Sequence, residues 1–367
     1  MASHLFPSQA FSIALLAAGL SGSASAQSYT VSNLDSDVPG AAANVDPQLV
    51  APIGLARGIL GPWWVSDEGS ALSTLYGGDG GKRGLVFNLP SPPGSSTPSR
   101  PTGTSFSGSP TEFNVSPGNP ALFLFVTLEG TILGWPGADV FDAAILVDSQ
   151  GEASYTGMTV AEVGNGHRLY AVDSRRGRIE AYDGSLNPVA LDDDAFRDER
   201  LPDGLIPFNV QQLGSDVVVT YRRRSEDLGE GGVRGWVSIF DARGRFLARL
   251  DAHGLDAPWG VTIAPHDFGE FSHLLLVANH GSGDIAAFDL FTGRFAGKML
   301  DPTGLPIHID GLWAISFGDG GIANFASGGP NTGPYNACYF TAAPQDGQHG
   351  LFGNLVPVMA EQTHDEQ

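Results

Sequence analysis

Side chains that carry oxygen or nitrogen donors recur in this sequence where short apolar runs begin or end. One set follows the second run of each repeated unit and comprises Asp67, Thr127, Asp173, Tyr221, Asn279 and Thr341, with Glu68, Glu129 and His280 beside them. Another set opens the first run of each unit and comprises Ile53, Thr102, Thr156, Phe208, Asn209, Trp259 and Asp310. Carboxylate and amide oxygens that converge from several units are the ligands that Ca²⁺ prefers. The pattern predicts a calcium site formed by Asp67, Glu129, Asp173, Asn209, Asn279 and Asp310.

Aspartates at strand ends have a second interpretation, because they commonly accept hydrogen bonds from the backbone amides of the following turn. Under this interpretation Asp67, Asp173 and Asn279 stabilise turns and bind no metal. The sequence leaves both possibilities open for these three residues.

The sequence HIDG at 308–311 places two candidate catalytic groups at a predicted inner strand. His308 and Asp310 alternate, so they would share one face of that strand, and His280 lies in the preceding unit. Asp310 would act as metal ligand or general base while the cation polarises a carbonyl, as in metal-assisted hydrolysis or lyase chemistry. An alternative is a transition-metal site of His280, His308 and His349.

Aromatic side chains near the same strand ends indicate a possible ligand surface. Trp259, Phe208, Tyr221 and Trp313 could stack on a glycan or a peptide. The alternative function is therefore a non-catalytic extracellular module that binds glycan or protein. Whether the chain is an enzyme stays open at this point.

These side chains must be positioned by a repeat, because one pattern of residues returns six times. The segments RLYAVDSRRGRIEAYD (168–183) and LLLVANHGSGDIAAFD (274–289) align without a gap. A short apolar run opened by one residue and then Gly begins at 53, 102, 156, 259 and 310, and Asn209 replaces Gly in the run at 208. A period near fifty residues is typical of radial or stacked arrays.

Each repeat contains three or four short runs bounded by Gly, Asp, Asn or Ser, which favours antiparallel strands. The sequence therefore predicts an all-β, six-bladed β-propeller over residues 27–358, with four strands per blade. A ring lets every blade pack on two neighbours and leaves only short edges. Because the last repeat shows three strands, we expect YTVSNL (29–34) to add its fourth strand and close the ring.

The termini and the charge restrict localisation and partners. FSIALLAAGL (11–20) and the small residues ASA (24–26) indicate a signal peptide at 1–26, hence a secreted protein. The rest of the chain shows no apolar stretch of membrane-spanning length, and 359–367 is predicted to be a polar tail. A net charge of −21 disfavours nucleic acid as a partner. We expect a monomer.

The repeat also carries a resemblance to known proteins. APIGLA, WWVSDEGSALSTLYGG, LYAVDSRRGRIEAYD, LLLVANHGSGDIAAFD and IDGLWAISFG resemble, in order, an uncharacterised family of secreted hypothetical proteins, over roughly residues 45–356. More loosely, each unit is similar to the NHL repeat of six-bladed propellers and to the calcium-dependent gluconolactonases. That likeness implies a catalytic, metal-binding Asp at Asp310 and an Asn ligand near Asn209. The Glu that those enzymes use at the start of their first blade is replaced here by Ile53.

The function predicted from these features is that of a secreted propeller. It would bind Ca²⁺ and a small or sugar-like ligand at the mouth of its channel. If it is an enzyme, it would be a metal-dependent hydrolase or lyase.

Overall fold

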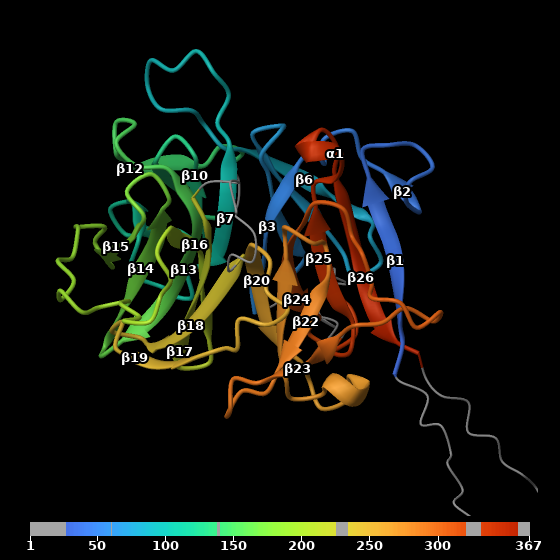
Figure 1. Ribbon diagram of the computed structural model, residues 1–367. Coiled ribbons are helices and arrows are strands. Elements are labelled where there is room, and N and C mark those ends of the chain that lie inside the picture. Colours follow the sequence, from blue (N-terminus) through green and yellow to red (C-terminus); the bar gives the residue numbers. More distant parts are fainter. Residues whose placement is uncertain (1–26, 60, 138–139, 225–233, 321–331, 359–367) are drawn as a thin grey trace, which may run out of the picture.

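The structure, a computed structural model, describes residues 27–59, 61–137, 140–224, 234–320 and 332–358. The predicted signal peptide and C-terminal tail lie outside these residues. Six antiparallel sheets surround a central axis like the blades of a propeller (Figure 1). The predicted all-β, six-bladed propeller is thereby confirmed.

The blades follow one another along the chain, and each begins with its innermost strand. The first three contain β3 (Pro52–Arg57), β4 (Trp63–Asp67), β5 (Leu72–Tyr76) and β6 (Lys82–Asn88); β7 (Pro101–Phe106), β10 (Phe123–Thr127), β11 (Thr131–Trp135) and β12 (Ala144–Asp148); and β13 (Tyr155–Val163), β14 (Gly166–Asp173) and β15 (Arg178–Asp183). The next two contain β16 (Leu205–Leu213), β17 (Asp216–Arg223), β18 (Gly235–Asp241) and β19 (Phe246–Arg249); and β20 (Pro258–Ile263), β21 (Leu275–Asn279), β22 (Ile285–Phe288) and β23 (Phe295–Lys298). The sixth contains β24 (Leu312–Phe317), β25 (Cys338–Ala342), β26 (Leu351–Pro357) and β1 (Tyr29–Ser36).

Smaller elements complete the fold. In the third blade, an isolated antiparallel bridge between Tyr182 and Pro188 takes the place of the outermost strand. A two-residue strand, β2 (Asn44–Val45), pairs in parallel with β1, and β8 (Asn114–Ser116) pairs with β9 (Asn119–Pro120). Two short helical turns, η1 (Gly269–Phe271) and α1 (Pro344–Gly347), lie in connections. No helix among the described residues is long and apolar enough to span a membrane.

The innermost strands form a closed ring around the channel. They contact one another in the order β3, β7, β13, β16, β20 and β24, and β24 returns to contact β3. The repeated Gly makes this close approach possible. A Cβ added at Gly54 would lie 2.4 Å from the carbonyl oxygen of Thr102, and one at Gly260 would lie 2.6 Å from that of Trp313.

The predicted repeat register is wrong in the sixth blade. The sequence suggests that Asp310-Gly311-Leu312 opens the inner strand, whereas β24 begins at Leu312. Its register, with Leu312 opposite Ala342 and an irregularity before Ile315, matches that of Pro258 opposite Asn279 in blade five. Trp313 and Ala314 therefore occupy the places of Trp259 and Gly260. Gly311 serves another need, because its φ of +66° favours glycine.

Apolar cores fill the spaces between neighbouring blades. The core between blades one and two stacks Trp64 on Phe123, with ring centroids 4.0 Å apart. The core between blades five and six includes Leu276, Phe340 and the N-terminal Tyr29. Because each blade contributes side chains to two such cores, burial between neighbours holds the ring together.

The predicted closure by the N-terminal strand is confirmed. Tyr29 to Ser36 of β1 pair antiparallel with Pro357 to Leu351 of β26, and Figure 1 shows the blue β1 beside the red β26. The chain ends of the propeller therefore meet within one sheet. No covalent link supports this closure, because the only cysteine of the chain is Cys338.

Two segments, 191–204 and 221–232, are longer than the corresponding connections of the other repeats and have different positions. Residues 191–204 pack on the outer part of blade four, where the buried carboxylate of Asp198 accepts hydrogen bonds from Trp236, Ser238 and Arg249. The apolar side chains of this segment join the core between blades three and four, away from the channel mouth. Most of 221–232 lies outside the described residues, but its flanks lie at the mouth, as shown next.

Candidate functional site

Aromatic and aliphatic side chains plug the centre of the channel. The plug contains Ile53, Phe208, Trp259 and Ala314, with Trp313 packed against it. Trp259 is 4% exposed and Phe208 is 3% exposed, so their faces are not available to a ligand in this structure. The indole N–H of Trp259 donates to the carbonyl of Thr156 at 3.0 Å. This bond links blade five to blade three and fixes the indole across the channel.

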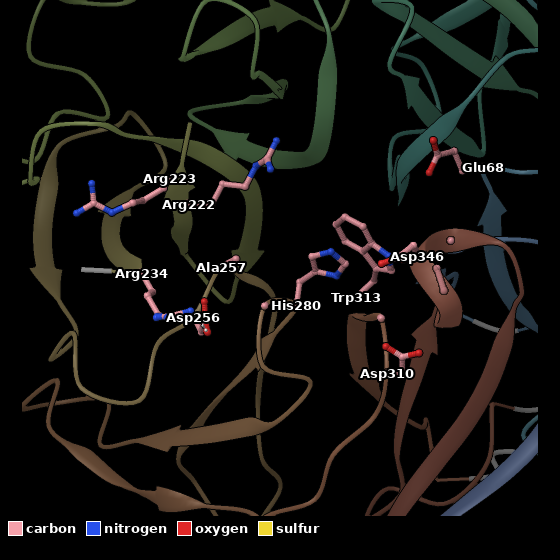
Figure 2. Close-up of a pocket in the computed structure, with 14 residues that line it drawn as sticks. Glu68, Arg222, Arg223, Arg234, Asp256, Ala257, His280, Asp310, Trp313 and Asp346 are labelled. Atoms are coloured by element: carbon pink, nitrogen blue, oxygen red, sulfur yellow. Dashed lines mark hydrogen bonds and ion pairs between the residues drawn. The ribbon is translucent and has the colours of Figure 1, made fainter. Parts of the chain in front are cut away.

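A pocket of about 670 Å³ lies above this plug at one mouth of the channel (Figure 2). Blades one, four, five and six contribute to it through the ends of their strands and the adjoining turns. Its lining includes Glu68, Arg222, Arg223, Arg234, Asp256, His280, Asp310, Trp313 and Asp346. The volume is within the usual range for small-molecule sites.

His280 and Trp313 lie together in the middle of this pocket (Figure 2). His280 directly follows β21, and Trp313 is the second residue of β24. Their rings stack with centroids 3.8 Å apart and an interplanar angle of 26°. Trp313 in turn meets Trp259 edge-on at 5.8 Å. The plug thus supports both rings from below.

The fold fixes the tautomer of His280. Its Nδ1 lies 3.0 Å from the carbonyl oxygen of Leu312. A carbonyl can only accept a hydrogen bond, so Nδ1 carries the proton and Nε2 of the neutral ring keeps its lone pair. Burial lowers the pKa of His280, and the nearby Arg222 lowers it further, while Asp310 and Asp256 act in the opposite direction.

Charged groups line opposite sides of the pocket. Figure 2 shows Arg222, Arg223 and Arg234 on one side of the His280 and Trp313 pair and Glu68, Asp310 and Asp346 on the other. Arg222 lies with its guanidinium carbon 4.5 Å from the centre of the Phe208 ring. Arg234 pairs with Asp256 at 3.3 Å. The side chain of Asp310 accepts a hydrogen bond from the backbone N–H of Gln345 at 2.9 Å.

The predicted calcium ligands do not form one cluster. Among the described residues, no group of three or more His, Cys, Asp or Glu side chains is placed to hold a metal ion. The carboxylate of Asp67 accepts from the amide and hydroxyl of Thr74 at 3.1 and 2.7 Å. Glu129 accepts from the amide and guanidinium of Arg100, both at 2.9 Å.

The remaining predicted ligands are likewise engaged locally. The side chain of Asp173 accepts from the amides of Ser154 and Arg175, both at 3.1 Å. Asn279 accepts from the amide of Asp256 and donates to the carbonyl of Gly254. The amide group of Asn209 donates to the carbonyl of Trp259 at 3.0 Å. The polar atoms of these side chains are therefore used in local hydrogen bonds. The six predicted residues do not fit a shared calcium ion.

The predicted histidine trio is also dispersed. Nδ1 of His308 lies 2.9 Å from the carbonyl of Ser282, and Nδ1 of His349 lies 2.9 Å from the carboxylate of Asp37. Only His280 of the three lines the mouth pocket. Of the predicted aromatic surface, Tyr221 is 2% exposed and packs in the core between blades three and four, whereas Trp313 reaches the pocket.

Two proteins of Acanthamoeba polyphaga mimivirus are similar to this chain in sequence. The uncharacterised protein R648 is 29% identical over 343 residues, which cover 89% of this chain and 79% of that protein. The uncharacterised protein L690 is 29% identical over 332 residues, covering 86% and 82%. No family model matches the chain.

Solved structures share the fold at low sequence identity. A streptogramin B lyase superposes with a TM-score of 0.52 at 12% identity, covering 90% of this chain and 98% of the lyase. An α-L-arabinofuranosidase from Fusarium graminearum superposes with a TM-score of 0.55 at 12% identity, covering 89% and 97%. At this identity the likeness shows the fold alone. The chain is therefore a six-bladed β-propeller related in sequence to uncharacterised viral proteins.

Proposed function

We propose that the mouth pocket binds a small, sugar-like ligand and that His280 acts on it as a general base in a hydrolase or lyase reaction. The observation that carries this proposal is the placement of His280. Its ring lines the pocket, is stacked on Trp313 and presents Nε2 with a lone pair.

The surroundings of His280 suit proton transfer. A lowered pKa keeps the imidazole neutral near pH 7, which is the form a base requires. Burial raises the pKa of Glu68, across the pocket, so that this carboxyl keeps its proton to a higher pH and can serve as the acid. In a hydrolysis, His280 would take a proton from the attacking water and Glu68 would give one to the departing oxygen.

The comparisons are compatible with this proposal. Two structural neighbours are enzymes, a lyase and a glycosidase, and the glycosidase structure holds an iminosugar inhibitor. These similarities support the view that this fold can hold a small molecule for catalysis. We assign the proton transfers to His280 and Glu68, because the six predicted calcium ligands contact separate partners within the fold.

The proposal can be tested by comparing His280→Asn with wild type on a panel of lactones and glycosides. The Asn amide keeps a donor for the carbonyl of Leu312 but provides no base. We expect kcat/KM to fall about 100-fold or more, as is typical when a general base is lost. His266→Asn, at an exposed position, is the matched control. Equal turnover by His280→Asn and wild type would rule out the proposed base, and binding without turnover would identify a non-catalytic binding module.

We further propose that the protein is secreted, on the strength of the apolar segment 11–20 and the small residues at 24–26. Expression of the full chain in a secretion-competent host, followed by mass spectrometry of the medium, tests this. We expect a mature protein that begins at Gln27. Recovery of the uncleaved chain inside the cells only would contradict it.

A further inference from the structure

We infer that the ligand of the mouth pocket is an acidic sugar, held with its carboxylate toward the arginines of blade four and its hydroxyl groups toward the carboxylates opposite. This inference rests on the proposed function and adds the chemical class and the orientation of the ligand. It follows from the separation of charges across the pocket, from the residues that fix those charges and from the size of the site.

The positive side of the pocket comes from one blade. Arg222 and Arg223 end β17, and Arg234 directly precedes β18. The ring of Phe208 lies under the guanidinium of Arg222, and both Arg222 and Arg223 make further interactions within the fold. The chain has 19 Lys and Arg against 40 Asp and Glu. Its overall field therefore repels anions, and an anionic group would need a local cluster of this kind to bind.

Guanidinium groups are well suited to a carboxylate. Their planar donors match two carboxylate oxygens at once, and the resulting charge-assisted hydrogen bonds are stronger than neutral ones. Asp256 already pairs with Arg234 inside the pocket. A carboxylate can therefore approach a guanidinium group on this side. A ligand carboxylate would reach the same side.

The negative side is built from three different segments. Glu68 follows β4, Asp310 precedes β24 and Asp346 lies in the α1 turn. The carboxylates of Asp310 and Asp346 accept hydrogen bonds, so this wall suits the hydroxyl groups of a sugar and repels a second anionic group, while Glu68 supplies the proton of the proposed reaction. The two walls therefore set the direction in which a molecule with one carboxylate and several hydroxyls enters.

The backbone around Asp346 is held in an uncommon conformation. Gln345 and Asp346 both have φ of 55°, in the left-handed region that residues other than Gly seldom adopt. The carboxylate of Asp310 binds the N–H of Gln345, and the N–H of Gly347 donates to the carbonyl of Ala343 at 3.1 Å. Such strain persists where the surroundings impose it, often at ligand sites. Here it places Asp346 at the rim beside Asp310.

The opposed walls act on the same side chain. Figure 2 shows His280 between Arg222 and Asp310, and the charges of these two side chains shift the pKa of His280 in opposite directions. The half-buried Trp313 adds an apolar surface next to His280. A pocket of about 670 Å³ has room for a monosaccharide or a short oligosaccharide.

The inference is tested by calorimetric titration of the mature protein with D-glucuronate, D-glucose and D-glucosamine. These sugars share a pyranose ring and differ in charge. We expect D-glucuronate to bind at least about tenfold more tightly than D-glucose, because one charge-assisted hydrogen bond corresponds to roughly that factor or more. Arg222→Gln should remove this preference, because it should weaken the binding of D-glucuronate about tenfold more than that of D-glucose. Arg294→Gln, at an exposed position in the turn between β22 and β23, should leave both affinities unchanged.

Two further variants keep the result interpretable. Arg234→Gln replaces a side chain that is 56% exposed, so it should fold even if Arg222→Gln does not, and it should also weaken D-glucuronate selectively. Trp313→Ala should weaken both sugars. Equal affinities for D-glucose and D-glucuronate, both lost in Trp313→Ala, would overturn the acidic class while the proposed mouth site stands. Binding of none of the three sugars would overturn both.

Discussion

The side chain of His280 has its chemistry set by its neighbours in the fold. Nδ1 is committed to the carbonyl of Leu312, and stacking on Trp313 removes one face of the ring from water. Both contacts come from the start of β24. This strand is distant from His280 in the sequence but lies beside β21 in the folded protein. The reactive nitrogen is therefore a product of the contact between blades five and six.

This environment predicts a pH dependence for His280. Its folded pKa lies below the ordinary value of 6.5. As pH falls below 6.5, the unfolded chain takes up this proton before the folded one does, so unfolding is favoured. The stability contributed by the neutral ring is fully present above pH 6.5 and is lost as pH falls through the folded pKa. Base function should be lost over the same range.

An NMR titration of the imidazole resonances checks this prediction, with His280→Asn used to assign the signal. We expect a midpoint below 6.5 in the folded protein and a return to the ordinary value in denaturant. A folded midpoint at or above 6.5 would show that burial does not control this group.

The sequence identified part of the site at the level of residues. His280, Asp310, Glu68 and Trp313 were all named from their positions at strand ends, and they do line one pocket. Asp67 and Asp173 were also named from their positions at strand ends, yet they are buried and accept hydrogen bonds from nearby backbone amides. Residue type and spacing cannot separate these outcomes, because the difference is whether the side chain finds a local donor.

The arginines of the pocket were missed. Arg222, Arg223 and Arg234 flank the insertion in blade four, at positions that neither set of recurring strand-end residues includes. A search for repeated positions therefore passes over them. The available signal was the run YRRR at 221–224 in a chain with a net charge of −21, since clustered cations in so acidic a chain require explanation.

At the scale of elements, the strands followed from the repeat but the register of one blade did not. The Gly after each opening residue is needed where a neighbouring inner strand approaches too closely for a Cβ. Asn209 and Ala314 stand at this position in blades four and six, where a Cβ is accommodated. In blade six Gly311 lies three residues earlier and supplied a false match, because its positive φ is a separate requirement.

The element that closes the ring, β1, is anchored by Tyr29. The phenol ring of Tyr29 is fully buried and contacts Phe268 and Phe271. Its hydroxyl donates to the carbonyl of Phe268 at 2.9 Å. We expect Tyr29→Ala to destabilise the protein by about 3–5 kcal/mol, the usual cost of removing a large buried aromatic. Tyr29→Phe should cost about 1 kcal/mol, the contribution of one hydrogen bond.

Denaturant unfolding at constant pH measures both changes. Phe291→Ala, at a position that is 97% exposed, is the control and should leave the unfolding midpoint in place. A Tyr29→Ala protein as stable as wild type would show that β1 contributes little to closure.

The same strand contains a carboxyl group that makes closure depend on pH. Asp35 is 1% exposed, and one of its oxygens has no hydrogen-bond partner among the described residues. Burial, aided by the neighbouring Asp46, raises its pKa to about 6 from an unfolded value of 3.8. Between pH 4 and 6 the unfolded chain releases this proton first. Stability should therefore fall by roughly 3 kcal/mol over that range and stay lower above it.

Asp35→Asn removes this effect because the amide stays neutral. We expect the variant to exceed wild type in stability at pH 7.5 and to lose most of that advantage at pH 4. Asp203→Asn, at an exposed position, should show no such dependence. Equal stability of Asp35→Asn and wild type at pH 7.5 would show that Asp35 is not destabilising when charged.

For the whole molecule, six similar sheets and their closure were predictable because a period near fifty residues leaves few other ways to bury both faces of each sheet. The filled channel was not predictable in the same way. The residues at the inner openings differ from blade to blade, and only the closed ring brings Ile53, Phe208 and Trp259 into contact. Their packing divides the channel, so that the site is a pocket at one mouth.

Closure of the ring by β1 predicts how the whole protein fails. Removal of residues 27–36 would leave the edge of β26 unpaired and open the core between blades five and six, since no disulfide bridges the junction. We expect a chain that starts at Asp37 to unfold at a lower temperature and to associate through the exposed edge of β26. A chain starting at Gln27 is the control and should be monomeric and stable. Size-exclusion chromatography and calorimetry distinguish the two, and a peptide of residues 27–36 added to the shortened chain should restore part of the lost stability. An unchanged melting temperature in the shortened chain would place closure in the contacts between inner strands instead of in β1.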